Sequence, residues 1–105
     1  MASNAGIAKS VNIVTRNGKK AIAAGETIRE GEFLGAAVGE IVASTKSKHA
    51  FRVEQGRGKL TKIVCKNKFK HMQESEKSNV ECRNGLFFAT RTIRKNAPIT
   101  ITSKL

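Results

Sequence analysis

The sequence contains no tryptophan, no tyrosine and no aspartate, and it has one proline and two cysteines in 105 residues. Without the two amphipathic aromatics, the core has to be built from Val, Ile, Ala, Leu and five Phe. A chain of this length buries only about two thirds of the surface that it exposes when unfolded. These limits favour a single small domain with a modest, β-rich core.

The cysteines and the apolar runs exclude further classes of protein. Cys65 and Cys82 are separated by 16 residues, with no Cys-x-x-Cys pair and no histidine at the spacing of a zinc ligand. We therefore predict no metal site and two reduced thiols in an intracellular protein, with nucleus and cytoplasm left open. No apolar run reaches the about 18 residues that a membrane span needs, so we expect a soluble chain that does not enter a membrane. The final Ser103-Lys104-Leu105 matches a peroxisomal signal, which we take as coincidence.

The missing residues also argue against catalysis. The chain has no aspartate, and its spacing offers no Ser-His-acid set. No glycine-rich phosphate loop is present. Glu74, Glu76 and Glu81 lie in a polar region with Lys77 between them, and His71 is a lone histidine that we interpret as structural. We therefore expect a non-enzymatic protein without a cofactor.

Positive charge is what the chain has in excess, because 20 Lys and Arg against 8 Glu give a formal charge of +12. Between residues 44 and 70, nine cations accompany the single acid Glu54, which concentrates +8 in about a quarter of the chain. Nucleic acid is the commonest polyanion that exploits such an excess, since neutralised phosphates release counterions. The predicted nucleic-acid-binding residues are Lys46, Lys48, Arg52, Arg57, Lys59, Lys62, Lys66, Lys68 and Lys70.

This segment reads as a basic hairpin. Its predicted tip, Gly56-Arg57-Gly58, presents Arg57 to a phosphate or a base edge. Alternation predicts a cationic strand face and a buried face, the former with Lys62, Lys66, Lys68 and Lys70 and the latter with Ile63, Cys65 and Phe69.

Stacking on bases has little support in this segment. Phe51 and Phe69, its only aromatic residues, fall on the apolar side. We expect phosphate-dominated binding to RNA or DNA. The alternatives are an ordinary solvated hairpin, a nucleoprotein and an acidic protein partner.

Short extended segments follow one another along the chain, so the predicted fold class is mainly β, with little helix. Residues 11–15 and 20–24 flank the turn residues Asn17 and Gly18 and predict a hairpin. Further extended segments are predicted at 33–42, 51–54, 60–65, 85–89 and 98–102, with a polar loop over 73–81. We read residues 1–10 as a partly ordered arm and residues 11–105 as one β domain.

An internal similarity supports this reading. Shifting the chain by 65 residues aligns 24–29 (A-G-E-T-I-R) with 89–94 (A-T-R-T-I-R), with four of six positions identical. Each copy lies between two apolar segments. Two similar units predict a quasi-symmetric β fold.

Residues 18–23 (G-K-K-A-I-A), 28–35 (I-R-E-G-E-F-L-G) and 38–42 (V-G-E-I-V) resemble the N-terminal half of a SET domain, the β-clip fold of protein lysine methyltransferases. Residues 86–93 (L-F-F-A-T-R-T-I) and 98–101 (P-I-T-I) are similar to its C-terminal half. The resemblance covers roughly residues 10 to 102, with the middle shortened. It implies a small SET-like β-clip.

The resemblance also implies what an enzyme of this family needs. A Gly-x-Gly turn and an Asn-His pair help to hold S-adenosylmethionine, and a C-terminal tyrosine lines the lysine channel. Here Gly18 is present, Lys20 replaces the second glycine, and residues 69–72 (F-K-H-M) lie near the Asn-His position without reproducing it. The chain contains no tyrosine, and no other side chain offers the same hydrogen bonding to the reacting amine.

We therefore expect a non-catalytic module. A SET-type methyltransferase that takes its missing groups from a partner is the alternative. A third reading is a small capsid-associated assembly protein, a homo-oligomer in which the glycine-rich segment from Gly35 to Gly39 packs between subunits.

Overall fold

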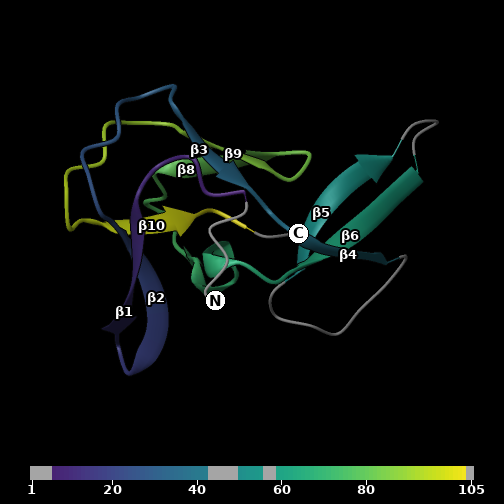
Figure 1. Cartoon of the computed structure of the whole chain (residues 1–105), viewed down its shortest axis with the longest axis horizontal. Coiled ribbons are helices and arrows are strands. Elements are labelled where there is room, and N and C mark those ends of the chain that lie inside the picture. The colour runs from purple at the N-terminus through teal and green to yellow at the C-terminus, as the bar shows by residue number, and fades with distance from the viewer. Residues whose placement is uncertain (1–5, 43–49, 56–58, 104–105) are drawn as a thin grey trace.

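The computed structural model describes residues 6–42, 50–55 and 59–103, without the side chains of residues 54, 55, 59 and 60. Within these residues the fold is mainly β, as predicted, with one short 3-10 helix, η1 (Figure 1). No helix of this part is long and apolar enough to cross a membrane. The elements are β1 (Val11–Arg16), β2 (Lys19–Ala24), β3 (Phe33–Ala36), β4 (Gly39–Val42), β5 (Ala50–Gln55), β6 (Lys59–Cys65), η1 (Lys68–His71), β7 (Gln73–Glu74), β8 (Val80–Arg83), β9 (Leu86–Ala89) and β10 (Pro98–Ile101).

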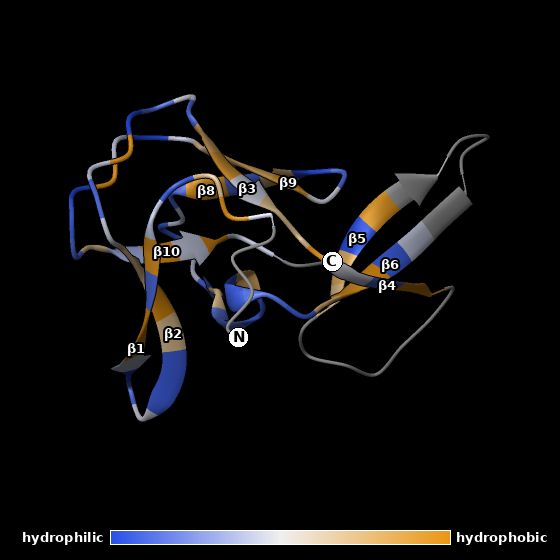
Figure 2. Cartoon of the chain, in the orientation of Figure 1, coloured by the Kyte–Doolittle hydropathy of each residue, from blue (hydrophilic) through white to orange (hydrophobic). Residues whose placement is uncertain are grey.

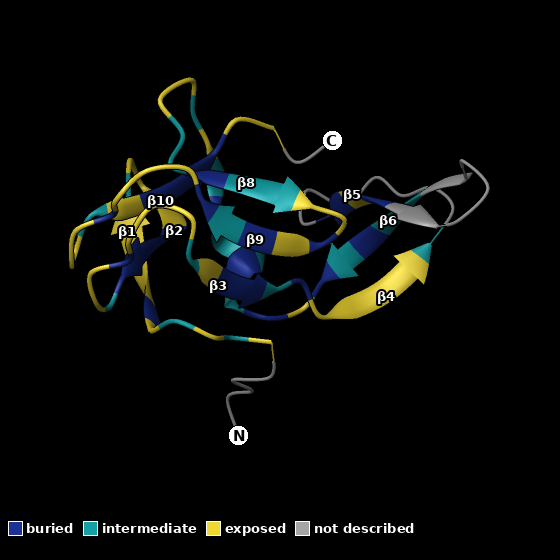
Figure 3. Ribbon diagram, turned by 90° about the horizontal axis from the view of Figure 1, so that it is seen from above, coloured by how far each residue is buried: buried dark blue, intermediate teal, exposed yellow. Residues whose placement is uncertain are grey.

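The strands form two sheets. The larger has the order β1-β2-β10-β8-β9-β3, with β7 also paired to β10, and the smaller has the order β4-β6-β5. Most neighbours are antiparallel, whereas β7 and β8 run parallel to β10. The smaller sheet extends from one side of the molecule, beyond the end of the β8–β9 hairpin (Figures 1 and 3).

Both tight hairpins turn at an Asn-Gly pair. Asn17 and Gly18 have φ of 55° and 75°, and Asn84 and Gly85 have 55° and 84°. Positive φ at both central residues matches the twist of antiparallel strands, and Asn-Gly tolerates it best. The β1–β2 hairpin was predicted from this pair, and the structure confirms it with Arg16 opposite Lys19.

The two similar segments pair with each other, which confirms the predicted quasi-symmetry. Ile28 and Ile93 exchange both backbone hydrogen bonds, at 2.8 and 2.7 Å. Ala24 N donates to Ala97 O at 2.9 Å, and the equivalent Ala89 N donates to Glu32 O at 2.9 Å. Each unit is a hairpin, a bend and a third strand, and each third strand pairs with the other unit's hairpin: β10 with β2, and β3 with β9. The two bends run side by side at the upper left of Figure 1.

The core is aliphatic with a cluster of three phenylalanines. The Phe87 ring centroid lies 4.9 Å from that of Phe51 and 4.6 Å from that of Phe69, and all three side chains are fully buried. Buried Ile, Leu, Val and Ala residues surround them, in agreement with a chain that lacks Trp and Tyr. The apolar segments of Figure 2 coincide with much of the buried chain in Figure 3, and several apolar residues at the ends and edges of strands stay exposed.

Residues just before β1 are attached to β3. Ala8 N and Lys9 N donate to Leu34 O at 2.9 and 3.0 Å, and Ile7 forms a bridge with Gly35. Residues 1–5 of the predicted arm lie outside the described part. The division of the chain at residue 10 therefore stays a prediction.

Candidate functional site

Two of the predicted binding residues lie on one side of the smaller sheet, and a third directly follows its middle strand. Arg52 of β5 and Lys62 of β6 are Cα partners, so their side chains project from the same face, and Lys66 directly follows β6. Arg52 and Lys66 are exposed and Lys62 is half-buried. Glu40 of β4 is the described acid on this face, by its pairing with Val64. We call Arg52, Lys62 and Lys66 the cationic sheet face.

The predicted strand alternation fails beyond Cys65, which is a correction. Lys68 and Lys70 lie in η1, not on a strand, because the chain turns at Asn67 to bury Phe69 against Phe87. Lys68 Nζ donates a hydrogen bond to Val11 O at 3.1 Å, so the Lys68 ammonium group links η1 to β1. Lys70 is half-buried on the same short helix.

The remaining predicted residues have no described side chain. Lys46, Lys48 and Arg57, with the Gly56-Arg57-Gly58 tip, lie outside the described residues, and for Lys59 only the backbone is described. The antiparallel pairing of β5 with β6 confirms the predicted hairpin over Ala50–Gln55 and Lys59–Cys65. Phe51 and Phe69 are buried, as expected, so neither is a surface for a base.

The SET resemblance also draws attention to the corner between the β1–β2 turn and η1, although no cofactor was predicted there. Arg16 at the end of β1 donates from Nη1 to Gln73 Oε1 at 3.5 Å, and Gln73 Nε2 donates to Arg16 O at 3.3 Å. These contacts join the β1–β2 turn, which contains Gly18, to the segment that follows η1. His71 at the end of η1 is half-buried, and Lys20 is exposed on β2.

The two cysteines, the possible metal ligands and Gly35 were also considered as site residues. Cys65 and Cys82 are both free thiols, and the former is buried. Burial raises the pKa of the Cys82 thiol, which opposes formation of the nucleophilic thiolate. Within the described ranges, no group of three His, Cys or Glu side chains could hold a metal ion. Gly35, part of the predicted subunit interface, is buried against Phe69 inside the chain.

An exposed apolar region was missed by the sequence reasoning. Phe33 and Phe88 are partners across β3 and β9, with ring centroids 5.4 Å apart, and Phe33 is 39% exposed. Arg83 lies over the Phe88 ring at 5.1 Å and forms an ion pair with Glu81. The sequence could not predict this Phe33–Phe88 contact, because it depends on the pairing of β3 with β9 and nothing within β3 identifies β9 as its partner.

Comparisons with known proteins place the fold. No family model and no curated protein matches the chain. Among solved structures, it is similar to the methyltransferase domain of human PR domain-containing protein 2, with a TM-score of 0.71 and 13% identity over 91% of this chain and 78% of that one. The fold is that of a SET domain.

Two further structures agree with the SET fold. ATXR5 in complex with histone H3.1 matches with a TM-score of 0.72 and 14% identity over 87% of this chain. The Neurospora SET domain protein DIM-5, a histone lysine methyltransferase, matches with a TM-score of 0.69 and 16% identity over 91% of this chain. The matched region spans about half the length of each of these two chains, 55% of ATXR5 and 52% of DIM-5. At these identities the likeness shows the SET fold alone, so what the chain does has to be argued from its own surface.

Proposed function

We propose that this SET-fold chain binds a polyanion, with nucleic acid as the leading candidate, through the cationic sheet face. The observation that carries the proposal is that Arg52 and Lys62 are partners on one face of two paired strands, with Lys66 directly after the second strand. The two described ion pairs, Lys9–Glu32 and Arg83–Glu81, involve none of the three.

The physical basis is the overall charge together with its local arrangement. A formal charge of +12 makes a chain of 105 residues repel itself unless a partner supplies negative charge. Phosphates neutralised by Lys and Arg release condensed counterions, and this term needs no base contact. Since Phe51 and Phe69 are buried, we expect phosphate-dominated binding with little sequence preference.

The test is binding to short single- and double-stranded RNA and DNA across a salt series, with the triple variant Arg52→Gln, Lys62→Gln and Lys66→Gln. The control variant Arg91→Gln, Arg94→Gln and Lys95→Gln removes the same charge from exposed positions of the second bend. On B-DNA, each phosphate that the variant no longer neutralises should reduce the slope of log affinity against log salt by about 0.9.

The comparison between the two variants decides the proposal. We expect the sheet variant to bind weakly and with a shallow slope, and the control variant to stay near the original chain. Equal reductions in affinity would assign binding to total charge, and no binding of any of the four nucleic acids at low salt would overturn the proposal in favour of an acidic protein partner.

A SET-type methyltransferase using S-adenosylmethionine is the second candidate, and the comparisons favour it. Two of the similar structures are described as a methyltransferase domain and a histone lysine methyltransferase. Against it stand Lys20 in place of the second glycine and a chain of 105 residues without tyrosine. A target lysine is also a cation, which a chain of charge +12 repels.

Cofactor titration separates the two candidates. Under the binding proposal, calorimetry detects no saturable uptake of S-adenosylmethionine, and labelled methyl groups are not transferred to lysine peptides. Saturable binding that His71→Ala abolishes, together with methyl transfer, would make the chain an enzyme. Light scattering addresses the assembly reading, because a protein that stays monomeric at high concentration is not an assembly subunit by itself.

A further inference from the structure

The outer face of β8, β9 and β3, three strands that lie side by side in Figure 3, carries two aromatic rings. Side chains alternate along a strand, so Phe87 of β9 points into the core whereas Leu86 and Phe88 point outward. Phe33 is the Cα partner of Phe88 and is 39% exposed, and Leu86 is 41% exposed. Apolar residues scattered singly need no explanation, whereas a contiguous exposed group indicates a binding surface.

A planar cation lies against the same rings. The guanidinium carbon of Arg83 is 5.1 Å from the centroid of the Phe88 ring, and the Arg83 side chain is 68% exposed. Arg83 forms an ion pair with Glu81, which is the Cα partner of Phe88 on this face. Even a bidentate ion pair leaves guanidinium N–H groups of Arg83 for another acceptor, such as a phosphate. We call Phe33, Arg83 and Phe88 the aromatic face.

An exposed aromatic ring beside an arginine is a surface on which unpaired nucleic-acid bases stack. Bases stack on aromatic rings and on the planes of guanidinium groups. This stacking tolerates any sequence, because every base has a π-face. The aromatic face offers both groups next to each other, Phe33 with an exposed ring and Arg83 with an exposed guanidinium.

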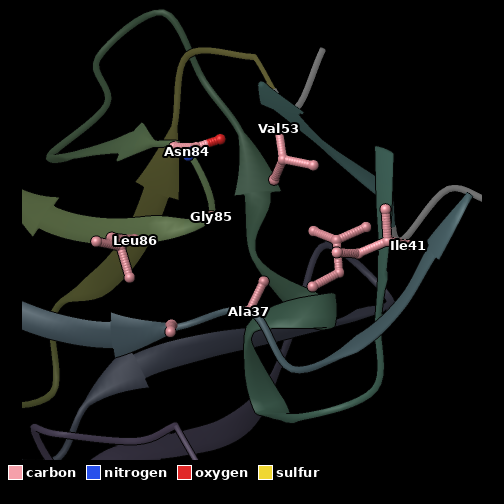
Figure 4. A pocket seen from close by; sticks show the side chains of 8 residues that line it. Ala37, Ile41, Val53, Asn84, Gly85 and Leu86 are labelled. Carbon is pink, nitrogen blue, oxygen red and sulfur yellow. The ribbon is translucent and has the colours of Figure 1, made fainter. Parts of the chain in front are cut away.

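The neighbouring cavity lacks these groups. Figure 4 shows it beyond Leu86, with Ile41 on the other side and Ala37 between them. It has a volume of about 230 Å³, and the described residues that line it include no aromatic ring and no charged side chain. A base therefore finds its stacking partners on the aromatic face and not in the cavity.

Charge favours a polyanion over a second copy of the chain as the occupant of this face. Two chains of +12 repel each other, whereas a polyanion is attracted. The acids beside the two rings are Glu81 and Glu32, and each is neutralised by a described ion pair, with Arg83 and with Lys9. Neither acid therefore opposes the approach of a phosphate.

We propose that the aromatic face binds unpaired bases of single-stranded RNA or DNA, with one base stacked on Phe33 and Arg83 beside a neighbouring phosphate. This inference rests on the proposed nucleic-acid binding and adds a second surface to it. The cationic sheet face attracts phosphates, and the aromatic face adds a contribution that depends on the presence of bases and not on their sequence. Bases within a duplex are stacked on each other, so only single strands use this face.

The test compares two single strands with equal numbers of phosphates, one of thymidylate and one of abasic residues. Each has about 12 nucleotides, within the usual range of single-strand sites. Their affinity for the full chain is measured by anisotropy across a salt series. We expect the thymidylate strand to bind about fivefold more tightly or better, which is the contribution of one stacked base. The ratio of the two affinities should stay constant with salt, because both strands release the same counterions.

Matched variants assign this ratio to the aromatic face. Phe33→Leu removes the ring but keeps an apolar side chain, so it should lower the ratio about fivefold or more. Ile13→Ala on β1 removes a side chain that is 47% exposed and should leave the ratio unchanged. The variant with Arg52, Lys62 and Lys66 all changed to Gln should weaken both strands alike.

A tryptophan reporter gives a second measurement at the same position. The chain contains no Trp and no Tyr, so Phe33→Trp introduces its only indole. A base stacked on this indole should quench its fluorescence when the thymidylate strand saturates the protein, and the abasic strand at saturation should not. Ile13→Trp is the control and should keep its emission with either strand.

Several results would overturn this assignment. Equal affinities of the thymidylate and abasic strands would overturn it alone and leave the cationic sheet face as a phosphate site. A ratio that Phe33→Leu does not lower would exclude Phe33 as the stacking partner. No binding of either strand at low salt would overturn the proposed function as well. A dimer in sedimentation that Phe33→Leu dissociates would assign the aromatic face to a second copy instead.

Discussion

Asn67 is the residue at which one side chain joins separate parts of the fold. Its Oδ1 accepts a hydrogen bond from the Cys65 thiol at 2.9 Å, and its Nδ2 donates to Ala36 O at 2.8 Å. Its backbone carbonyl also accepts from Lys70 N at 3.1 Å. Asn67 therefore holds the end of β6 and the start of η1 against β3, and it is buried in doing so.

We predict that Asn67→Ala destabilises the domain, because it removes the hydrogen bond to the part-buried Ala36 carbonyl and the one from the buried Cys65 thiol. A buried polar group without a partner costs about 1–3 kcal/mol. Urea unfolding followed by circular dichroism measures the destabilisation, with Asn12→Ala at an exposed position of β1 as the control. A destabilisation no larger than that of the control would contradict the role given to Asn67.

Gly39 is required for the close contact between β4 and β6. A Cβ built at this position overlaps the carbonyl oxygen of Val64, which belongs to the paired strand and cannot move aside. We expect Gly39→Ala to destabilise the chain by roughly 1–3 kcal/mol, as overpacking typically does. The control is Glu40→Ala on the same strand, and equal midpoints in urea for the two variants would count against the steric argument.

At the residue scale, burial was more predictable than the roles of polar residues. Alternation placed Phe51 correctly in the core, and Phe69 is buried although it lies on η1 and not on the predicted strand. The role of Asn67 could not be predicted, because an asparagine in a basic segment looks like any loop residue. Its partners come from β6 and β3, which only the folded chain brings together.

At the scale of elements, those specified by local signals were predictable. The Asn17-Gly18 turn fixes the β1–β2 hairpin, and the repeated segments identify the two units that pair through Ile28 and Ile93. By contrast, η1 interrupts an alternating sequence because burying Phe69 outweighs continuation of the strand. The pairings of β3 with β9 and of β7 with β10 join distant segments, which no local pattern reports.

Glu32, just before β3, forms a contact with the N-terminal segment that should weaken in acid. Glu32 accepts hydrogen bonds from Lys9 Nζ at 2.9 Å and from Arg29 N at 2.6 Å. The hydrogen bond from Lys9, followed by that from Arg29 N, lowers the pKa of the Glu32 carboxyl. A carboxyl whose pKa is lower in the folded state stabilises the fold above its unfolded-state pKa, and this contribution disappears as the pH falls through the folded-state value.

We predict that Glu32→Gln removes part of the decrease in stability on acidification, with a small effect because the pair is exposed. Unfolding by urea at neutral and acidic pH measures it, and Glu76→Gln, at an exposed position of the polar region after β7, is the control. Side-chain NMR titration provides the direct reading. A midpoint for Glu32 at or above that of a free glutamate would refute the assigned contacts.

At the scale of the whole molecule, the SET fold is present although no family model matches the sequence. Short motifs were sufficient to predict it, because the bends and turns of the two units carry most of the recognisable residues. The function is harder to derive, since the same fold hosts different activities. Arg52 and Lys62 lie on one face of the smaller sheet, and whether that face binds a polyanion stays a prediction.

The charge of the whole chain leads to a prediction about stability. At +12, compaction brings like charges together, whereas the two described ion pairs are both on the surface and contribute little attraction. Added sodium chloride screens repulsion over a Debye length of about 10 Å at 0.1 M, so the thermal midpoint should rise with salt. Scanning calorimetry across a salt series measures this rise. The variant with Arg52, Lys62 and Lys66 all changed to Gln should be more stable at low salt and respond less to added salt, because it carries three fewer of the repelling charges. A midpoint that falls with salt, or that falls when these cations are removed, would mean that attractive pairs dominate, and the cations would then be part of the fold and not a surface kept for a polyanion.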